Sequence, residues 1–469
     1  MTDSAATATA PLYTRSYRGW MLTLLVAIYA SSSLDRLIIA ALGPALKRDL
    51  LISDTQFGLL GGILFMFVYT AGGIPIARLA ERFNRVWIIS AALATWSAFT
   101  ALCALATSFA HLLLLRMGVG LGESGCAPTC YSLLSDQYPP RARASAVAIL
   151  GLGVPIGSAA GAFLGGWASD VLSWQAAFVI AGVPGLVLAL IVLLGLREPP
   201  RGTFDPAGRR SEDVPPLLEV LKRIGGKPAF MHLTMLAALA IFCNLGLNLF
   251  IPAFFVRSFG LSFSEAGAYF GLITGLAAAF GTTVLGLGIA RLARGDSRWY
   301  GWGPGLLMIL GAPVYIAGLL QDDFRAALVL LMISSPIGFA FLGPAVGATQ
   351  NMMDPRMRAS AAALFLFVMN MVGGGLGPVF TGQVSDWLAS RAFAGDFAAM
   401  CPGGVAPAAA GSDLAAACAA AAEHGLRYAL VACALFFVWG GIHALLATRT
   451  MRRDLGEQDL TQTMQEATA

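Results

Sequence analysis

Charge is scarce in this sequence. Of its 469 residues, 12% are charged and 57% are hydrophobic, whereas soluble domains carry about a quarter charged residues. A large soluble core does not explain the deficit, because a water-exposed surface would still need charge. The composition therefore excludes an ordinary soluble protein and indicates an integral membrane protein.

Signals for several other classes of protein are also missing. The small-residue stretch "ATATA" precedes the first apolar run, which is the wrong order for a cleavable signal peptide, so we expect none. The four histidines are dispersed without metal-ligand spacing, so we expect no metal. No Ser/His/Asp or Cys/His constellation falls on facing helices, which argues against a membrane-embedded enzyme. We also expect no nucleic-acid partner and no cofactor beyond coupled protons.

Cysteine is sparse and falls into two groups. Five of the seven cysteines lie in apolar runs, where a small buried hydrophobe is the ordinary interpretation. Cys401 and Cys418 instead share a polar, alanine-rich segment. If that segment is extracytoplasmic, the two could form a disulfide.

Long apolar runs are what the sequence does have. Twelve can be marked, at 19–42, 56–77, 86–107, 111–135, 145–168, 174–196, 231–256, 266–290, 301–320, 325–350, 359–384 and 427–447. Most reach the length of about 20 residues that a membrane helix needs. We predict an all-α membrane protein with twelve transmembrane helices in two six-helix bundles. The predicted units are 1–197, a cytoplasmic linker at 198–229, and 230–469 with an extracytoplasmic loop at 386–425 and a cytoplasmic tail.

Basic residues orient this arrangement. Of the 30 Lys and Arg, 22 fall in the segments that are cytoplasmic if the N-terminus is inside, and six fall in the outer loops. This positive-inside bias favours cytoplasmic termini. We expect a multi-pass protein of a bacterial inner membrane.

The two bundles carry traces of an internal repeat. "IARLA" occurs at Ile76–Ala80 and at Ile289–Ala293, and "PRARASA" at 140–146 returns as "PRMRASA" at 355–361. The helices that follow the second motif both end in Ser-Asp, at 169–170 and 385–386. "ISD" near the second helix resembles "FSE" near the eighth, with Ser53 and Ser264 as expected N-caps. These matches at displacements of 211 to 216 indicate a parallel duplication.

Four charged residues stand well inside predicted spans, all in the first half: Asp35, Arg36, Arg116 and Glu123. Such a charge costs about 2.5–3.5 kcal/mol on insertion scales, so each is a functional candidate. The repeat places uncharged residues at the matching positions of the second half, namely Gly246 to Asn248, Met332 and Phe339. A purely structural ion-pair network is the alternative, and both roles are compatible.

Helix geometry suggests how these charges pair. At 1.5 Å per residue, Asp35 and Arg116 lie at similar depth, and Glu123 lies about 10 Å deeper on the same face as Arg116. We predict that Asp35 pairs with Arg116 and that Arg36 reaches towards Glu123. Asp35 and Glu123 are then the candidate proton sites, because nearby guanidinium groups and burial act on a carboxylate in opposite directions.

The second half offers a different lining. Its spans contain Asn244, Asn248 and Asn370 among many Phe and Met residues. This combination suits an amphiphile, with its apolar tail on Phe and Met and its polar head on the arginines of the first half. Hydrogen bonds between helices are an equally good explanation of the three asparagines.

The loop between the second and third spans resembles that of the major facilitator superfamily. The family signature G-x-L-A-D-R-x-G-R-R aligns with "ARLAERFNRV", in which Leu79, Ala80, Arg82 and Arg85 match and Glu81 replaces the aspartate. The resemblance implies that Glu81, Arg82 and Arg85 form a cytoplasmic latch between the halves.

Within that superfamily, two stretches of the first half are similar to spinster-family transporters. They are "LDRLIIAALGPALKRDLLISDTQFGLL" and "RMGVGLGESGCAPTCYSLLSD", which place family motif positions on Asp35, Arg36, Arg116 and Glu123. The resemblance implies export of lysophospholipids or sphingoid phosphates with proton coupling.

We therefore predict a proton-coupled secondary active transporter that works by alternating access. Its expected partners are an amphiphilic or lipid-like substrate, such as a lysophospholipid, sphingoid phosphate or drug, and the membrane lipids. We expect a monomer. A proton-linked importer of small organic anions, with Arg36 and Arg116 holding a carboxylate, is the alternative, and a non-transporting sensor has little support.

Overall fold

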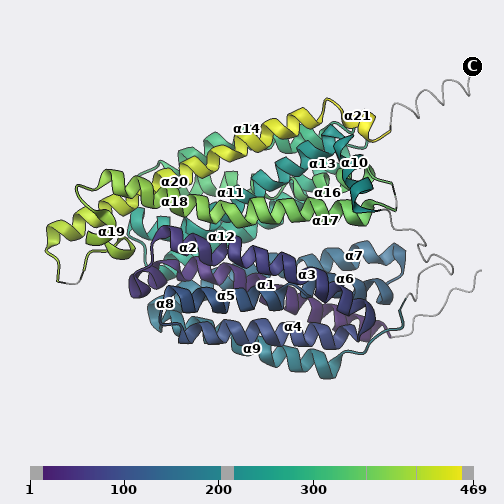
Figure 1. Cartoon of the computed structure of the whole chain (residues 1–469), viewed down its shortest axis with the longest axis horizontal. Coiled ribbons are helices and arrows are strands. Elements are labelled where there is room, and N and C mark those ends of the chain that lie inside the picture. The colour runs from purple at the N-terminus through teal and green to yellow at the C-terminus, as the bar shows by residue number, and fades with distance from the viewer. Residues whose placement is uncertain (1–13, 202–215, 355, 408, 457–469) are drawn as a thin grey trace, which may run out of the picture.

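Two helical bundles stand side by side in the computed structural model of this chain (Figure 1). The structure describes residues 14–201, 216–354, 356–407 and 409–456, and these ranges contain helices and no β-strand. The first bundle contains α1 (Arg15–Leu50), α2 (Asp54–Gly61), α3 (Ile63–Arg82), α4 (Arg85–Leu102), α5 (Phe109–Glu123), α6 (Cys126–Gln137), α7 (Pro140–Gly151), α8 (Gly153–Val171) and α9 (Trp174–Gly195).

The second bundle repeats this order. It contains α11 (Pro228–Phe259), α12 (Phe263–Ala279), α13 (Gly286–Leu292), α14 (Trp299–Leu319), α15 (Phe324–Ser334), α16 (Leu342–Asn351), α17 (Arg358–Val368), α18 (Leu376–Ala392) and α20 (Ser412–Ala447). Three short helices lie outside the spans, namely α10 (Leu217–Gly225), α19 (Phe397–Met400) and α21 (Met451–Asp454). The predicted all-α architecture of two six-helix units is confirmed.

Eleven helical spans in the described ranges are long and apolar enough to cross a membrane. The twelfth predicted span is present as α5 and α6, which are separated at Ser124 and Gly125, so neither part alone reaches that length. The matching span of the second half is also interrupted, by a 3₁₀ turn at Ser335–Gly338 between α15 and α16. The duplication therefore preserves a break as well as a helix order.

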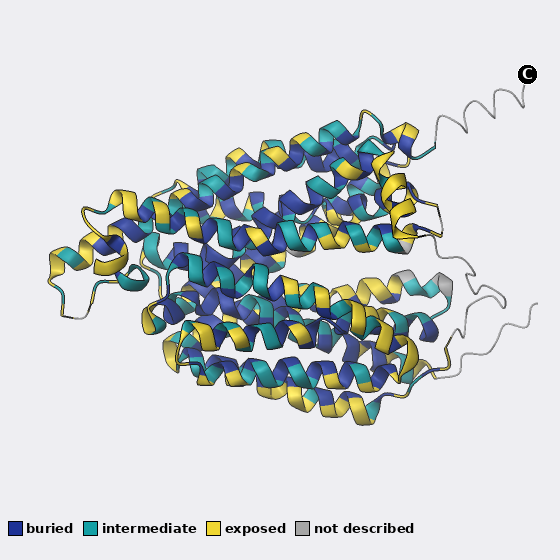
Figure 2. Cartoon of the chain, viewed as in Figure 1, coloured by how far each residue is buried: buried dark blue, intermediate teal, exposed yellow. Residues whose placement is uncertain are grey.

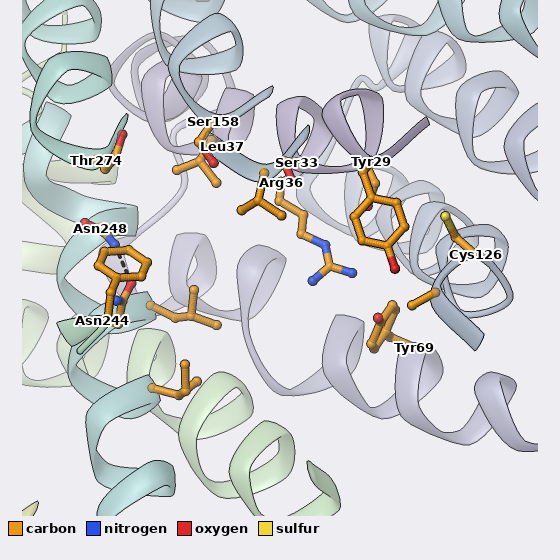
Figure 3. Close-up of a pocket in the computed structure, with 16 residues that line it drawn as sticks. Tyr29, Ser33, Arg36, Leu37, Tyr69, Cys126, Ser158, Asn244, Asn248 and Thr274 are labelled. Atoms are coloured by element: carbon orange, nitrogen blue, oxygen red, sulfur yellow. Dashed lines mark hydrogen bonds between the residues drawn. The ribbon is translucent and has the colours of Figure 1, made fainter. Parts of the chain in front are cut away.

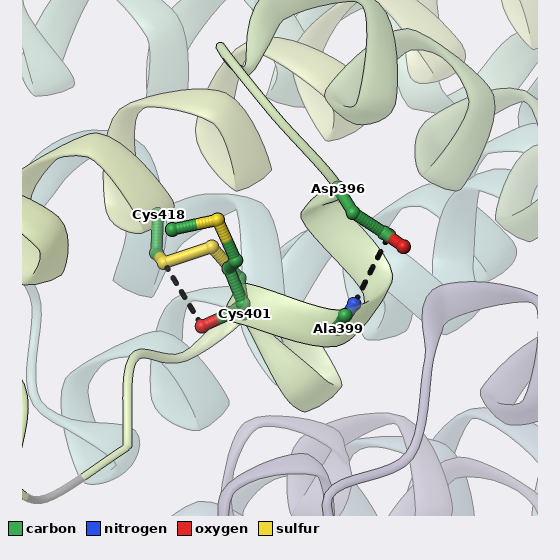
Figure 4. Close-up of a disulfide and its surroundings, with 5 residues drawn as sticks. Asp396, Ala399, Cys401 and Cys418 are labelled. Carbon is green, nitrogen blue, oxygen red and sulfur yellow. Dashed lines mark hydrogen bonds between the residues drawn. A yellow bond between two sulfur atoms is a disulfide. The ribbon is translucent and has the colours of Figure 1, made fainter.

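The two ends of the molecule differ. One end carries the start of α1 together with α10 and α21, and we call it the linker end (Figure 1). The opposite end carries the Cys401–Cys418 disulfide, whose Cα atoms are 5.6 Å apart, and we call it the disulfide end (Figure 4). Figure 2 shows exposed residues along the outer helix α9, as expected for a surface that faces lipid.

The predicted extracytoplasmic loop at 386–425 includes parts of two helices. Helix α18 continues to Ala392 and α20 already begins at Ser412, so only the segment between them lies outside these helices. The stretch after Ser412 is rich in alanine, which has the highest helix propensity, so it forms a helix although it lacks the large apolar residues of a membrane span. Helix α20 consequently projects past the bundle and carries Cys418.

The helix starts correct one sequence expectation. Ser53 caps α2 as predicted, and Gln56 completes a capping box with it. Helix α12, however, is capped by Ser262 and not by Ser264, because Glu265 stands three residues after Ser262 and completes the same box. The shared pattern is Ser-x-x-Gln/Glu, displaced by 209 residues.

Candidate functional site

The buried charges of the first half meet between α1 and α5. Asp35 and Arg36 lie on α1, and Arg116 and Glu123 lie on α5. The Nε–H of Arg36 donates to Oε2 of Glu123 at 2.6 Å, as expected from the depth of the two residues. The Glu123 side chain is fully buried, whereas a third of the Arg36 side-chain surface is exposed. The ion pair thus has one partner inside the protein and one at a cavity wall.

Asp35 does not form the predicted ion pair with Arg116. Nη1–H of Arg116 instead donates to the backbone carbonyl oxygen of Asp35 at 3.2 Å. The indole N–H of Trp96 and the hydroxyl of Thr100 lie beside the Asp35 carboxyl group. Within the described residues, neither carboxyl oxygen of Asp35 has a hydrogen-bond partner. The two residues are neighbours as predicted, but the contact runs through the backbone carbonyl of Asp35 and not through its carboxyl group.

Two aromatic residues on α3 hold the guanidinium groups, and the sequence analysis missed both. The Phe65 ring lies 5.0 Å from the Arg116 guanidinium carbon and 5.9 Å from that of Arg36. The Tyr69 ring lies 4.5 Å from that of Arg36. Such cation–π contacts are worth about 0.5–2 kcal/mol each. The four-residue spacing of Phe65 and Tyr69 puts them on one helix face, but nothing in the sequence says which neighbour that face meets.

A cavity of about 280 Å³ lies between the halves beside Arg36. Figure 3 shows the Arg36 guanidinium on one side near Tyr69, and Asn244 and Asn248 on the other. Its wall is mostly apolar and includes Leu37, Ile241, Leu245 and Phe339. The cavity therefore presents one cationic group, two amides and an apolar surface to a ligand.

The asparagines of the second half have different surroundings. Asn248 donates to Oδ1 of Asn244 at 2.6 Å, and Asn244 donates to the carbonyl of Gly338 at 3.2 Å. Asn244 is thus engaged within its own half, and Asn248 is the better placed of the two for a ligand. Asn370 lies in a π-helical turn at Met369–Gly375 and is not among the described residues that line the cavity.

The loop after α3 is organised by Arg85, which is 1% exposed. Its guanidinium donates to Asp136 of the first half at 2.5 Å and to Glu198, the first residue of the predicted linker, at 2.6 Å. Glu81 and Arg82 are exposed at the linker end. A latch between the halves made by Glu81, Arg82 and Arg85 stays a prediction, for a conformation in which the linker end is closed.

Comparison with known proteins adds three findings. The profile of the Major Facilitator Superfamily matches residues 22–378. An MFS-type efflux pump of Mycolicibacterium smegmatis is 32% identical over 378 residues, which cover 79% of this chain and 85% of the pump. The sphingosine-1-phosphate transporter SPNS2 of Danio rerio is 24% identical, and the match covers 76% of this chain and 73% of that transporter.

A solved structure extends the likeness to three dimensions. It is a bacterial homologue of the human lysosomal transporter spinster, in an inward-facing and unoccupied conformation. The two chains superpose with a TM-score of 0.84 at 32% identity, over 94% of this chain and 99% of the homologue. These relatives are transporters and not enzymes.

Proposed function

Because the chain belongs to the major facilitator superfamily, we propose that it is a proton-coupled exporter of amphiphilic, lipid-like substrates that works by alternating access. The observation that supports this most is the Arg36–Glu123 ion pair at the wall of a mostly apolar cavity. We place the linker end in the cytoplasm on the positive-inside bias. The conformation then corresponds to the inward-facing state named for the spinster homologue. We propose a monomer in a bacterial inner membrane.

The ion pair supplies the coupling. A cationic group can neutralise Glu123 only while that carboxylate is ionised, so the cation and a proton exclude each other there. Exclusive binding is what exchange requires, because an inward proton gradient then drives the cation outward. A zwitterionic head group suits both members of the ion pair. Its phosphate would accept hydrogen bonds from Arg36, and its ammonium group would form an ion pair with Glu123.

Asp35 supplies a second proton position in this proposal. A carboxylate without an ion-pair partner is costly to bury in its charged form, and Asp35 is completely buried. We propose that Asp35 carries a proton in this conformation and loses it when α1 and α5 move relative to each other. Arg116, which already contacts the backbone of Asp35, would then neutralise the carboxylate.

The test is transport in proteoliposomes with an acidic lumen. Uptake of a labelled lysophospholipid or cationic amphiphile should rise at least tenfold over liposomes without a pH gradient. The gradient should have no such effect on protein-free liposomes. Equal uptake with and without the gradient would refute proton exchange.

Import of small organic anions with protons is the second candidate, and the exposed part of Arg36 favours it. A carboxylate bound to Arg36 would release Glu123, which could then take up a proton, so the anion and the proton would bind together. In proteoliposomes with an alkaline lumen, a dicarboxylate would accumulate inside, because it enters together with protons. That result, without uptake of lysolipid, would reverse the ranking of the two functions.

A further inference from the structure

At the disulfide end, the two bundles meet along two seams that the duplication relates. One seam joins α2 of the first half to α18 of the second, and the other joins α12 to α8. Both α2 and α12 begin with backbone N–H groups that have no partner within the helix. In each, the capping-box serine accepts from the third N–H, Gln56 in α2 and Glu265 in α12, at 3.2 Å.

In both seams, an aspartate from the opposite half accepts the first two N–H groups. The Asp386 carboxylate accepts from Asp54 N at 3.0 Å and from Thr55 N at 2.8 Å. The Asp170 carboxylate accepts from Phe263 N at 3.2 Å and from Ser264 N at 2.6 Å. These aspartates belong to the repeated Ser-Asp pairs, which lie in α8 and α18. Each pairs a negative charge with the positive end of a helix dipole across the interface.

Close backbone contact accompanies each aspartate. A Cβ atom on Gly382 would lie 2.2 Å from the carbonyl oxygen of Asp54, and one on Gly166 would lie 2.3 Å from that of Phe263. Gly166 and Gly382 each precede their aspartate by four residues. Any larger side chain would hold the seam apart, so both seams are built for full closure.

The two seams are not equally strong. The Asp54 side chain also accepts from Nη1 and Nη2 of Arg257 in the opposite half, at 2.9 and 3.0 Å, and from Ser385 at 2.6 Å. Lys47 of its own half contacts it as well. Asp386 is partly buried, whereas Asp170 is exposed to solvent, which weakens its electrostatic contribution. The α2–α18 seam therefore contributes more of the free energy that keeps the disulfide end closed.

We infer that Asp170 and Asp386 are gating residues of transport. They hold the disulfide end closed while the cavity opens towards the linker end, and both must release their helix before the disulfide end can open. The α8–α12 seam, held by the exposed aspartate, releases at lower cost. This inference depends on alternating access and not on proton coupling or on the substrate.

Distances between spin labels in nanodiscs test the inference without substrate or pH gradient, so failure here leaves the coupling proposal standing. Labels replace Leu172 and Leu320, which are exposed at the disulfide end in opposite halves, in a variant whose five free cysteines are serine. Asp386→Asn should raise the fraction of molecules with a long distance between the two labels about tenfold. Asp170→Asn should raise that fraction about threefold. Glu265→Gln is the matched control, because it removes a charge at the same helix start without crossing the seam, and it should change nothing.

Gly382→Ala and Gly166→Ala give a second test, because each adds a Cβ atom that the closed seam cannot accept. Both should shift the same label pair to longer distances, whereas Gly288→Ala, where nothing lies within 4 Å, should not. Wild-type distances in both Asn variants would overturn the inference. A label pair within the first half, at Leu105 and Leu172, should stay constant. Broadening of that pair in the Asn variants would show that the aspartates support the fold and do not gate.

Discussion

The two halves of the molecule share a helix order and even a helix break, yet only the first keeps charge inside the membrane. Asp35, Arg36, Arg116 and Glu123 are replaced at the repeat positions by apolar or amide side chains, namely Gly246 to Asn248, Met332 and Phe339. The second half shows that the fold does not need these charges. Their insertion cost is therefore best explained by a function that the first half performs.

The same contrast occurs at the linker end, and it gives the largest expected effect on stability. Arg85 and Arg298 each lie five residues after a copy of "IARLA". Arg85 is buried against Glu198 and Asp136, whereas Arg298 is 38% exposed beside Asp296. Arg85→Ala should lower the free energy of unfolding by about 3–5 kcal/mol, because it removes the buried guanidinium that neutralises Asp136 and Glu198. Arg298→Ala, measured by thermal unfolding in the same detergent, should match the wild type. Equal losses in the two variants would contradict the asymmetry.

The Arg36–Glu123 pair gives the next largest effect. Arg36→Ala should cost about 3 kcal/mol, at the low end for a buried pair because Arg36 is partly exposed. Arg36→Leu combined with Glu123→Leu should be more stable than Arg36→Ala, since no unpaired charge remains. Chemical unfolding of the three variants measures this. A double variant less stable than the single one would show that the ion pair itself stabilises the fold.

Asp35→Asn should change stability and function in opposite directions. The amide is neutral without taking up a proton, so it removes the cost of protonating a buried carboxyl group, and the free energy of unfolding should rise by about 1 kcal/mol. Transport driven by a pH gradient should nevertheless fall at least tenfold, because the amide cannot carry a proton. Strong destabilisation of the variant would contradict this. It would indicate that Asp35 is ionised in the wild type and is stabilised by a positively charged partner.

The smallest effect is expected in the second half. Asn248→Ala removes a hydrogen bond between two positions of α11, and such bonds in membranes are worth about 0.6 kcal/mol on average. Transport should fall less than fivefold and keep its pH dependence. Loss of pH-driven transport in Asn248→Ala would place part of the coupling in the second half and weaken the comparison.

Much of the fold was predictable because membrane insertion constrains composition strongly. The apolar runs and the repeat followed from hydropathy and matched motifs, whereas much of the predicted linker at 198–229 lies outside the described residues. Helix α20 was drawn too short because alanine is neither strongly apolar nor a loop former. Ser264 was preferred to Ser262 because the repeat was aligned on three letters, although the capping-box spacing from Ser262 to Glu265 was visible in the sequence.

The site was predictable in its members and less so in its contacts. Four buried charges are conspicuous in a sequence with little charge, and depth along two helices was enough to pair Arg36 with Glu123. Depth does not determine which atoms of two residues meet, so the contact of Arg116 with the backbone carbonyl of Asp35 was not predictable. Phe65 and Tyr69 carry no signal against a background of aromatic residues, and their role depends on which face of α3 meets α1 and α5.

The most direct test of the central claim is pH-driven transport by Glu123→Gln beside Phe339→Leu, its repeat counterpart in the second half. Both variants are reconstituted into liposomes with an acidic lumen, and initial uptake of the same labelled amphiphile is compared with and without the gradient. We predict that Phe339→Leu keeps the acceleration by the gradient and that Glu123→Gln loses it while it still exchanges substrate. A Glu123→Gln protein that is accelerated by the gradient as strongly as the wild type would contradict the account.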